Sequence, residues 1–188
     1  MNEEVSKRVE EMKKWLLEVE EDLTGVTCCF TGHRQQKLPW RANEEDKRCL
    51  LMINRTKEKI EKAIKEGYKH FISGMAIGFD MICAEIVLEL KEKYPNITLE
   101  CALPCRNQHE RWSKNLQIRY ENILNKADKI RCIYKTYIKG CMHERNRYMI
   151  SNSSLVISLF DNIEGGTKIS LDFAKKMGRK IEIIKSIE

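Results

Sequence analysis

The sequence predicts an α/β protein with a Rossmann-like, doubly wound, mostly parallel sheet and helices on both faces. From residue 26 onward, short apolar runs alternate with longer helical stretches, and glycine-rich or polar tripeptides follow several of the apolar runs. The apolar runs are continuous and do not alternate with polar residues, which is typical of strands covered on both faces. The repeated strand–helix order then favours an open, doubly wound sheet.

The predicted strands and helices follow from this pattern and from the glycine and proline residues that end the helices. The predicted strands are residues 26–31, 69–73, 97–103, 130–134, 154–160 and 180–184. The predicted helices are residues 44–66, 78–93, 108–127, 141–152 and 167–178. Gly67, Pro95 and Gly178 mark helix ends, because glycine and proline terminate helices.

An extra amphipathic helix is predicted over residues 1–24, ahead of a Rossmann-like domain over residues 25–188, with Gly25 as its stop. Its apolar stripe is Val5, Val9, Met12, Trp15, Leu16, Val19 and Leu23. This stripe either packs on the flank of the domain or builds a subunit interface. We expect a homo-oligomer, because symmetric dimers are common.

Composition narrows the class of protein. The chain has 188 residues, of which 42% are hydrophobic and 33% charged, as in a globular domain. No apolar run is long enough to span a bilayer, and the acidic N-terminus lacks a signal core, so we expect a cytoplasmic protein without a membrane partner. The eight cysteines are expected to be reduced. A net charge of +6 allows a nucleic-acid partner but does not favour one.

The candidate ligand-binding residues follow the ends of four predicted strands. Because the carboxyl ends of parallel strands meet at one edge, where open α/β sheets bind ligands, these loops should form one site. They are Thr31, Gly32, His33 and Arg34; then Ser73, Gly74, Met75, Gly78 and Asp80; then Pro104 and Arg106; and then Asp161, Glu164, Gly165, Gly166 and Thr167.

The turn Gly165-Gly166-Thr167 is the predicted phosphate site, because free N–H groups at a helix start attract anions. Arg145 and Arg147 add positive charge, and one of them is expected to face the pocket while the other is solvated. Asp80 either caps its helix or contacts a ribose hydroxyl. The glycine spacing matches neither the dinucleotide fingerprint nor a P-loop. No cofactor is therefore assigned. No metal ligand is assigned, because the chain has no paired C-x-x-C, and no catalytic residue is assigned.

These motifs together resemble the SLOG superfamily, which is related to the Lonely-guy (LOG) phosphoribohydrolases and to the DNA-processing protein DprA. Thr31-Gly32-His33-Arg34 is similar to the YpsA-like branch, Ser73 to Asp80 to a DprA motif, and Met142-His143-Glu144-Arg145 to the LOG basic motif. Arg145-Asn146-Arg147, followed by a strand and a glycine turn, also resembles DprA. The similarity covers residues 26–184.

One departure bears on function. The LOG turn continues into two glutamates that glycosidic cleavage needs, whereas Thr167 is followed by Lys168, Ile169 and Ser170. Asp80, Glu85 and Glu164 are the carboxylates left to replace them. The resemblance therefore implies a stand-alone binder of a nucleotide-derived small molecule (a nucleotide, an ADP-ribose-like compound or a cyclic nucleotide signal) that senses or sequesters it without catalysis. The alternatives are a nucleotide N-glycosidase and a DprA-like single-stranded nucleic-acid binder.

Overall fold

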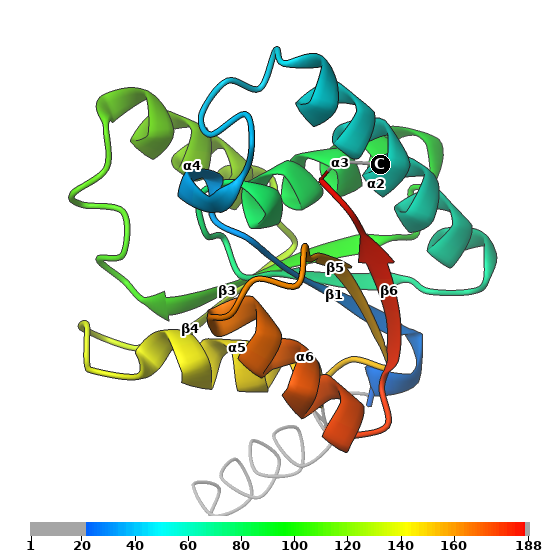
Figure 1. Ribbon diagram of the computed structural model, residues 1–188. Coiled ribbons are helices and arrows are strands. Elements are labelled where there is room, and N and C mark those ends of the chain that lie inside the picture. Colours follow the sequence, from blue (N-terminus) through cyan, green and yellow to red (C-terminus); the bar gives the residue numbers. More distant parts are fainter. Residues whose placement is uncertain (1–21, 187–188) are drawn as a thin grey trace, which may run out of the picture.

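The computed structural model describes residues 22–186 and contains a six-stranded sheet in which all neighbouring strands are parallel. The spatial order is β4-β3-β2-β1-β5-β6, so the strand order reverses between β1 and β5 (Figure 1). This confirms the predicted doubly wound class. The strands are β1 (Thr27–Gly32), β2 (His70–Ser73), β3 (Thr98–Cys105), β4 (Lys129–Tyr134), β5 (Leu155–Leu159) and β6 (Lys180–Ile184).

Helices cover both faces of the sheet, as predicted (Figure 1). One face carries α2 (Lys47–Lys65), α3 (Phe79–Lys93) and α4 (Lys114–Lys126), and the other carries α5 (Cys141–Ser151) and α6 (Gly166–Lys176). Short 3-10 turns span Thr24–Val26 and Gln35–Lys37. Within residues 22–186, no helix has the length and apolar character that crossing a membrane requires.

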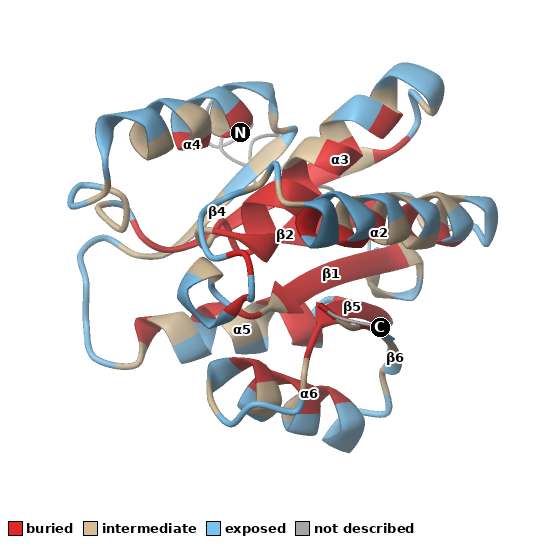
Figure 2. Ribbon diagram, turned by 45° about the horizontal axis from the view of Figure 1, so that its top comes forward, coloured by how far each residue is buried: buried red, intermediate tan, exposed pale blue. Residues whose placement is uncertain are grey.

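The core consists of two layers, one on each face of the sheet (Figure 2). Phe30, Phe71 and Leu99 point to the layer under α2 and α3, whereas Ile72 and Val156 point to the layer under α5 and α6. The central strands are therefore buried on both sides, which explains why their sequences are continuous apolar runs. All eight cysteines are free, and seven of them are buried.

Two predicted helices start later than expected. The helix predicted from residue 44 begins at Lys47, because Asp46 caps it by accepting a 2.8 Å hydrogen bond from the Arg48 N–H. The helix predicted from residue 108 begins at Lys114, and the preceding residues form turns. The Gln117 side chain hydrogen-bonds to carbonyl oxygens of these turns, which stabilises them in place of a further helical turn.

The predicted N-terminal helix falls on residues 1–24, of which residues 1–21 lie outside the described part of the chain. The structure therefore does not test the amphipathic stripe or its partner. The described chain starts at Asp22 and enters β1 through the short turn Thr24–Val26.

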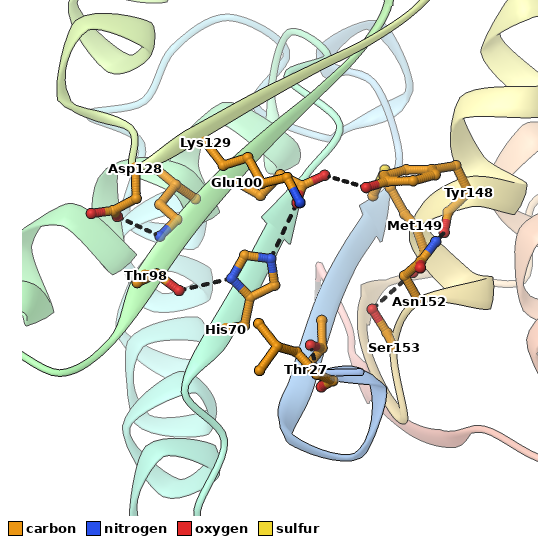
Figure 3. A network of polar contacts seen from close by, with 12 residues as sticks. Thr27, His70, Thr98, Glu100, Asp128, Lys129, Tyr148, Met149, Asn152 and Ser153 are labelled. Atoms are coloured by element: carbon orange, nitrogen blue, oxygen red, sulfur yellow. Dashed lines mark hydrogen bonds and ion pairs between the residues drawn. The ribbon is translucent and has the colours of Figure 1, made fainter. Parts of the chain in front are cut away.

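A buried polar network ties β2 and β3 to α5 near the amino ends of these strands (Figure 3). Nε2 of His70 lies 3.3 Å from a carboxylate oxygen of Glu100, and the Tyr148 hydroxyl donates to the other oxygen at 2.6 Å. Burial works to raise the pKa of Glu100, but His70, Tyr148 and Lys129 outweigh it and leave that pKa below its usual value. Burial and the Glu100 carboxylate raise the pKa of Tyr148 to about 12. Because the members satisfy one another, the network stabilises the fold.

Candidate functional site

The glycine turn after β5 places the start of α6 at the carboxyl edge of the sheet. Gly165 adopts φ 141°, which L side chains rarely adopt, and it precedes α6 without any side-chain cap. The first N–H groups of α6 therefore lack both a helical acceptor and a capping side chain. Nζ of Lys37 donates a 2.8 Å hydrogen bond to the carbonyl oxygen of Glu164 and adds positive charge beside the turn.

The loop after β1 lies against this turn, because β1 and β5 are neighbours in the sheet. Nε2 of His33 accepts a 3.0 Å hydrogen bond from the Asp161 N–H and so ties the two loops together. Burial lowers the pKa of His33, in keeping with a neutral ring. The imidazole thus uses Nε2 as an acceptor within the fold, and this nitrogen is not available as a donor or an acid toward a ligand.

The loop after β2 is held by a buried ion pair. Nη1 of Arg145 on α5 lies 3.7 Å from Oδ2 of Asp80 and donates to the carbonyl oxygen of Gly74. Ser73 Oγ donates to the Asp80 carbonyl oxygen at 2.7 Å and accepts from the Met75 N–H at 3.2 Å. Burial raises the pKa of Asp80, and Arg145 opposes that rise. These contacts join the β2 loop to α5 and form one wall of the site.

Gly78 fixes how the β1 and β2 loops meet. It has φ 101°, and a Cβ at this position would lie 3.1 Å from the backbone nitrogen of Gln35. Arg34 and Gly78 form an isolated antiparallel bridge. A glycine is therefore needed for this close approach of two backbones, which places the Arg34 side chain at the rim between the two loops.

These loops enclose a cavity of about 460 Å³, within the size range of small-molecule sites. The predicted residues that line it are Thr31, Gly32, His33, Arg34, Asp80, Arg145, Gly165, Gly166 and Thr167. The lining residues that the prediction missed are Gln36, Lys37, Ala76, Met142, His143 and Asn146. Met142 and His143 belong to the basic motif in the sequence, so that motif was a usable signal for them.

The other predicted residues lie off this cavity. Arg147 is exposed and stacks on Phe173, with its guanidinium carbon 5.6 Å from the ring centre, so Arg145 is the arginine that faces the pocket. The Asp161 carboxylate accepts a hydrogen bond from the Ser186 N–H and is used within the fold. The Glu164 side chain is 82% exposed.

The remaining predicted residues come from the ends of β2 and β3 and the segments after them, and they do not line this cavity. Ser73, Gly74, Met75 and Gly78 support the β2 loop from behind, whereas Ala76 and Asp80 from the same segment line the cavity. Pro104 is buried in β3, and Arg106 is exposed on the loop that follows it. The prediction that all four loops line one pocket is therefore too broad, because β3 lies two strands away from β1.

These features define a Rossmann-like α/β domain. The sheet is parallel, its strand order reverses between β1 and β5, and a ligand-sized cavity lies at its carboxyl edge beside the glycine turn. A model for the YpsA family, described as the YspA SLOG family, matches residues 28–186. The chain therefore belongs to this SLOG family, which confirms the resemblance that its motifs indicated.

Two bacterial proteins are similar in sequence to this chain. A UPF0398 protein of Brevibacillus brevis is 30% identical over 140 residues, which are 73% of each chain. The uncharacterized SPbeta prophage-derived protein YoqJ of Bacillus subtilis is 34% identical over 130 residues, which cover 62% of this chain and 76% of YoqJ.

Two DNA processing protein A structures show the same fold. The Helicobacter pylori protein, solved for its single-stranded DNA binding mode, matches with a TM-score of 0.59 and 22% identity over 87% of this chain and 67% of that one. The Streptococcus pneumoniae protein matches with a TM-score of 0.59 and 14% identity, over 87% of this chain and 51% of its own length.

Proposed function

We propose that the chain binds a nucleotide-derived small molecule through its phosphate, and that it senses or sequesters this ligand without cleaving it. The observation that carries the proposal is the uncapped start of α6, which opens into the cavity beside Arg34 and Lys37. Helix N-termini and glycine turns bind phosphate because their N–H groups and the helix dipole favour an anion.

The charges around the cavity support an anionic ligand. Arg145 is already paired with Asp80, so its charge is largely compensated. Arg34 has no carboxylate within ion-pair distance among residues 22–186, and Lys37 hydrogen-bonds only to a carbonyl oxygen in that range. These two side chains therefore supply the uncompensated positive charge, and arginine suits a phosphate because its planar fork binds two oxygens.

The three carboxylates that are candidates to replace the LOG glutamates are poorly placed for glycosidic cleavage. Glu85 pairs with Arg119 at 2.6 Å on the α3–α4 side of the molecule, and Asp80 is buried against Arg145. Glu164 is exposed beside Lys168. Glycoside cleavage requires a carboxylate beside the reacting carbon, so the arrangement favours a binder over an N-glycosidase.

Isothermal titration calorimetry with ribose 5-phosphate and AMP tests the proposal. Arg34→Met should weaken the binding of both about tenfold to a hundredfold, because a hydrogen bond to a charged group contributes about 1.5–3 kcal/mol. Arg106→Met is the matched control, since Arg106 is exposed outside the cavity. An absence of binding by both compounds would refute the proposal. Chromatography of the AMP mixture should show no free adenine, and its appearance would favour the N-glycosidase.

Single-stranded DNA binding is the second candidate, favoured by the fold shared with the Helicobacter pylori protein. Exposed basic residues such as Arg106 and Arg111 lie on the loop between β3 and α4, beyond the phosphate cavity. A DNA-binding role predicts that a labelled oligonucleotide binds with a steep salt dependence and that Arg106→Met weakens it. If Arg106→Met leaves AMP binding unchanged but weakens oligonucleotide binding, the second function is present as well.

A further inference from the structure

A second cavity adjoins the phosphate cavity and was not part of the site predicted from the sequence. It has a volume of about 430 Å³. Arg34, Gln36, Ala76 and Met142 line both cavities, so the two spaces share a boundary. A ligand held by its phosphate at the start of α6 can therefore extend past Arg34 into the second cavity.

The walls of this second cavity carry two aromatic side chains. Trp112 lies on the loop before α4 and packs edge-on against the fully buried ring of Tyr120, with ring centres 5.3 Å apart. This contact holds the indole in position. Tyr137 comes from the loop between β4 and α5 and is 63% exposed. An aromatic side chain offers a stacking surface to a flat heterocycle, and here one ring is fixed while the other is free to adjust.

The amide side chains of this cavity are oriented as acceptors. Nε2 of Gln108 donates to the Met75 carbonyl oxygen at 3.2 Å and to the Tyr120 hydroxyl at 3.0 Å, which leaves Oε1 to offer to a ligand. Nδ2 of Asn107 donates to Glu110 at 3.4 Å, and Oδ1 is buried without a hydrogen-bond partner in the part of the chain that the structure describes. Such an orphaned acceptor is costly unless something donates to it.

The charged groups in this cavity complete its polarity. Glu110 adds a carboxylate, a third acceptor, whereas Arg34 at the boundary and the exposed Arg111 are donors on long, adjustable side chains. Gln108 is held by the two hydrogen bonds that its Nε2 donates, so Oε1 of Gln108 is the ligand-facing polar group with the best-defined position. A ring that carries an amino group can donate to Oε1 of Gln108, whereas a ring that presents a carbonyl at that place cannot.

We propose that the second cavity binds the base of a nucleotide whose phosphate lies at the start of α6, and that it prefers a base with an exocyclic amino group, such as adenine. This inference rests on the proposed function and adds its specificity. Trp112 and Tyr137 supply stacking, and Gln108 accepts a hydrogen bond from the amino group. The matched oxo base hypoxanthine leaves that acceptor unpaired and is rejected.

Calorimetry with three ligands separates this inference from the proposed function. Ribose 5-phosphate reports the phosphate cavity, AMP adds an amino base, and IMP replaces the amino group by a carbonyl. AMP should bind at least about tenfold more tightly than ribose 5-phosphate, because only AMP has a base that stacks. It should also bind about tenfold more tightly than IMP, which stacks equally well but leaves the Gln108 acceptor unpaired. If ribose 5-phosphate binds and AMP gains nothing over it, the base site is wrong and the proposed function stands. If none of the three binds, both are wrong.

Variants in the cavity locate the effect. Tyr137→Ser alters an exposed side chain. It should weaken the binding of AMP about tenfold and leave the affinity for ribose 5-phosphate unchanged. Gln108→Met should remove the preference of AMP over IMP, again without changing ribose 5-phosphate. An unchanged ribose 5-phosphate affinity also shows that each variant is folded. A loss of all three ligands to the same degree in both variants would overturn the inference, because it would show a structural role only.

Discussion

The Arg145→Met variant is expected to have a lower free energy of unfolding than the wild-type protein, and the size of this deficit should depend on pH. Nη1 of Arg145 lies 3.7 Å from Oδ2 of Asp80, and the two side chains are only 5% and 8% exposed. Methionine fills a similar volume but carries no charge. The variant therefore leaves a buried carboxylate without its cation and the Gly74 carbonyl oxygen without its donor.

The size of the effect follows from the geometry. Two unit charges at this separation attract by about 4 kcal/mol at an effective dielectric constant of about 20. Removing one partner of a buried ion pair typically costs about 3–5 kcal/mol. We therefore expect Arg145→Met to lower the free energy of unfolding by about 3–5 kcal/mol at neutral pH, which is a large part of the total stability of an ordinary domain.

The sign of the pH dependence follows from Asp80. Burial raises the pKa of Asp80 in the folded state, and Arg145 is the strongest group that opposes this rise. Without Arg145 the pKa of Asp80 rises further, so the folded variant holds this proton more tightly than the unfolded chain does. Stability from such a group is present at low pH and is lost as the pH rises through the folded pKa. The deficit should thus be smaller at about pH 5 than at about pH 8.

Urea unfolding of the wild-type protein and the Arg145→Met variant, followed by circular dichroism at both pH values, measures this difference in the free energy of unfolding. Arg147→Met is the matched control on the same helix, because Arg147 is exposed and stacks on Phe173; it should cost less than about 1 kcal/mol. A deficit below about 1 kcal/mol for Arg145→Met, or a deficit of the same size at both pH values, would refute the account of the buried pair.

Two further substitutions test the packing and the second polar network. Gly32→Ala places a Cβ 2.7 Å from Cβ of Phe79, so overpacking should lower the free energy of unfolding by about 1–3 kcal/mol. Gly25→Ala is the control and should not lower it, because no atom lies within 4 Å of the added Cβ. Equal urea midpoints for the two variants would contradict this prediction. Glu100→Gln should cost about 1–3 kcal/mol at neutral pH, because it weakens the hydrogen bond from Tyr148. Since the pKa of Glu100 is lowered by folding, that cost should shrink as the pH falls below the usual value of 4.5, and a constant cost in an acid titration of stability would count against the network.

The strands could be predicted from the sequence, because burial on both faces of the sheet requires a continuous run of apolar residues. The apolar run Leu155–Leu159 is buried throughout, and its predicted range differs from the observed strand by one residue at each end. The turn Gly165-Gly166-Thr167 could also be placed at the site, because parallel topology brings the ends of β1 and β5 together.

Other parts of the site have no comparable pattern in the sequence. Lys37 reaches the cavity because the loop after β1 folds back with Leu38 and Trp40 buried, and neither residue forms part of a periodic pattern. The ion pair of Asp80 with Arg145 was not predicted, because Arg145 comes from a distant part of the sequence. The turns around Trp112 were predicted as helix, because side-chain hydrogen bonds from Gln117 to the backbone cannot be read from periodicity.

Amide chemical shifts measured while ribose 5-phosphate is added to ¹⁵N-labelled protein would show where the phosphate binds. If the phosphate docks at the uncapped start of α6, the amide signals of Gly166 and Thr167 should shift the most, with a saturable dependence on ligand concentration. Saturable shifts confined to residues outside this turn, or no shift of these two amides at all, would contradict the site.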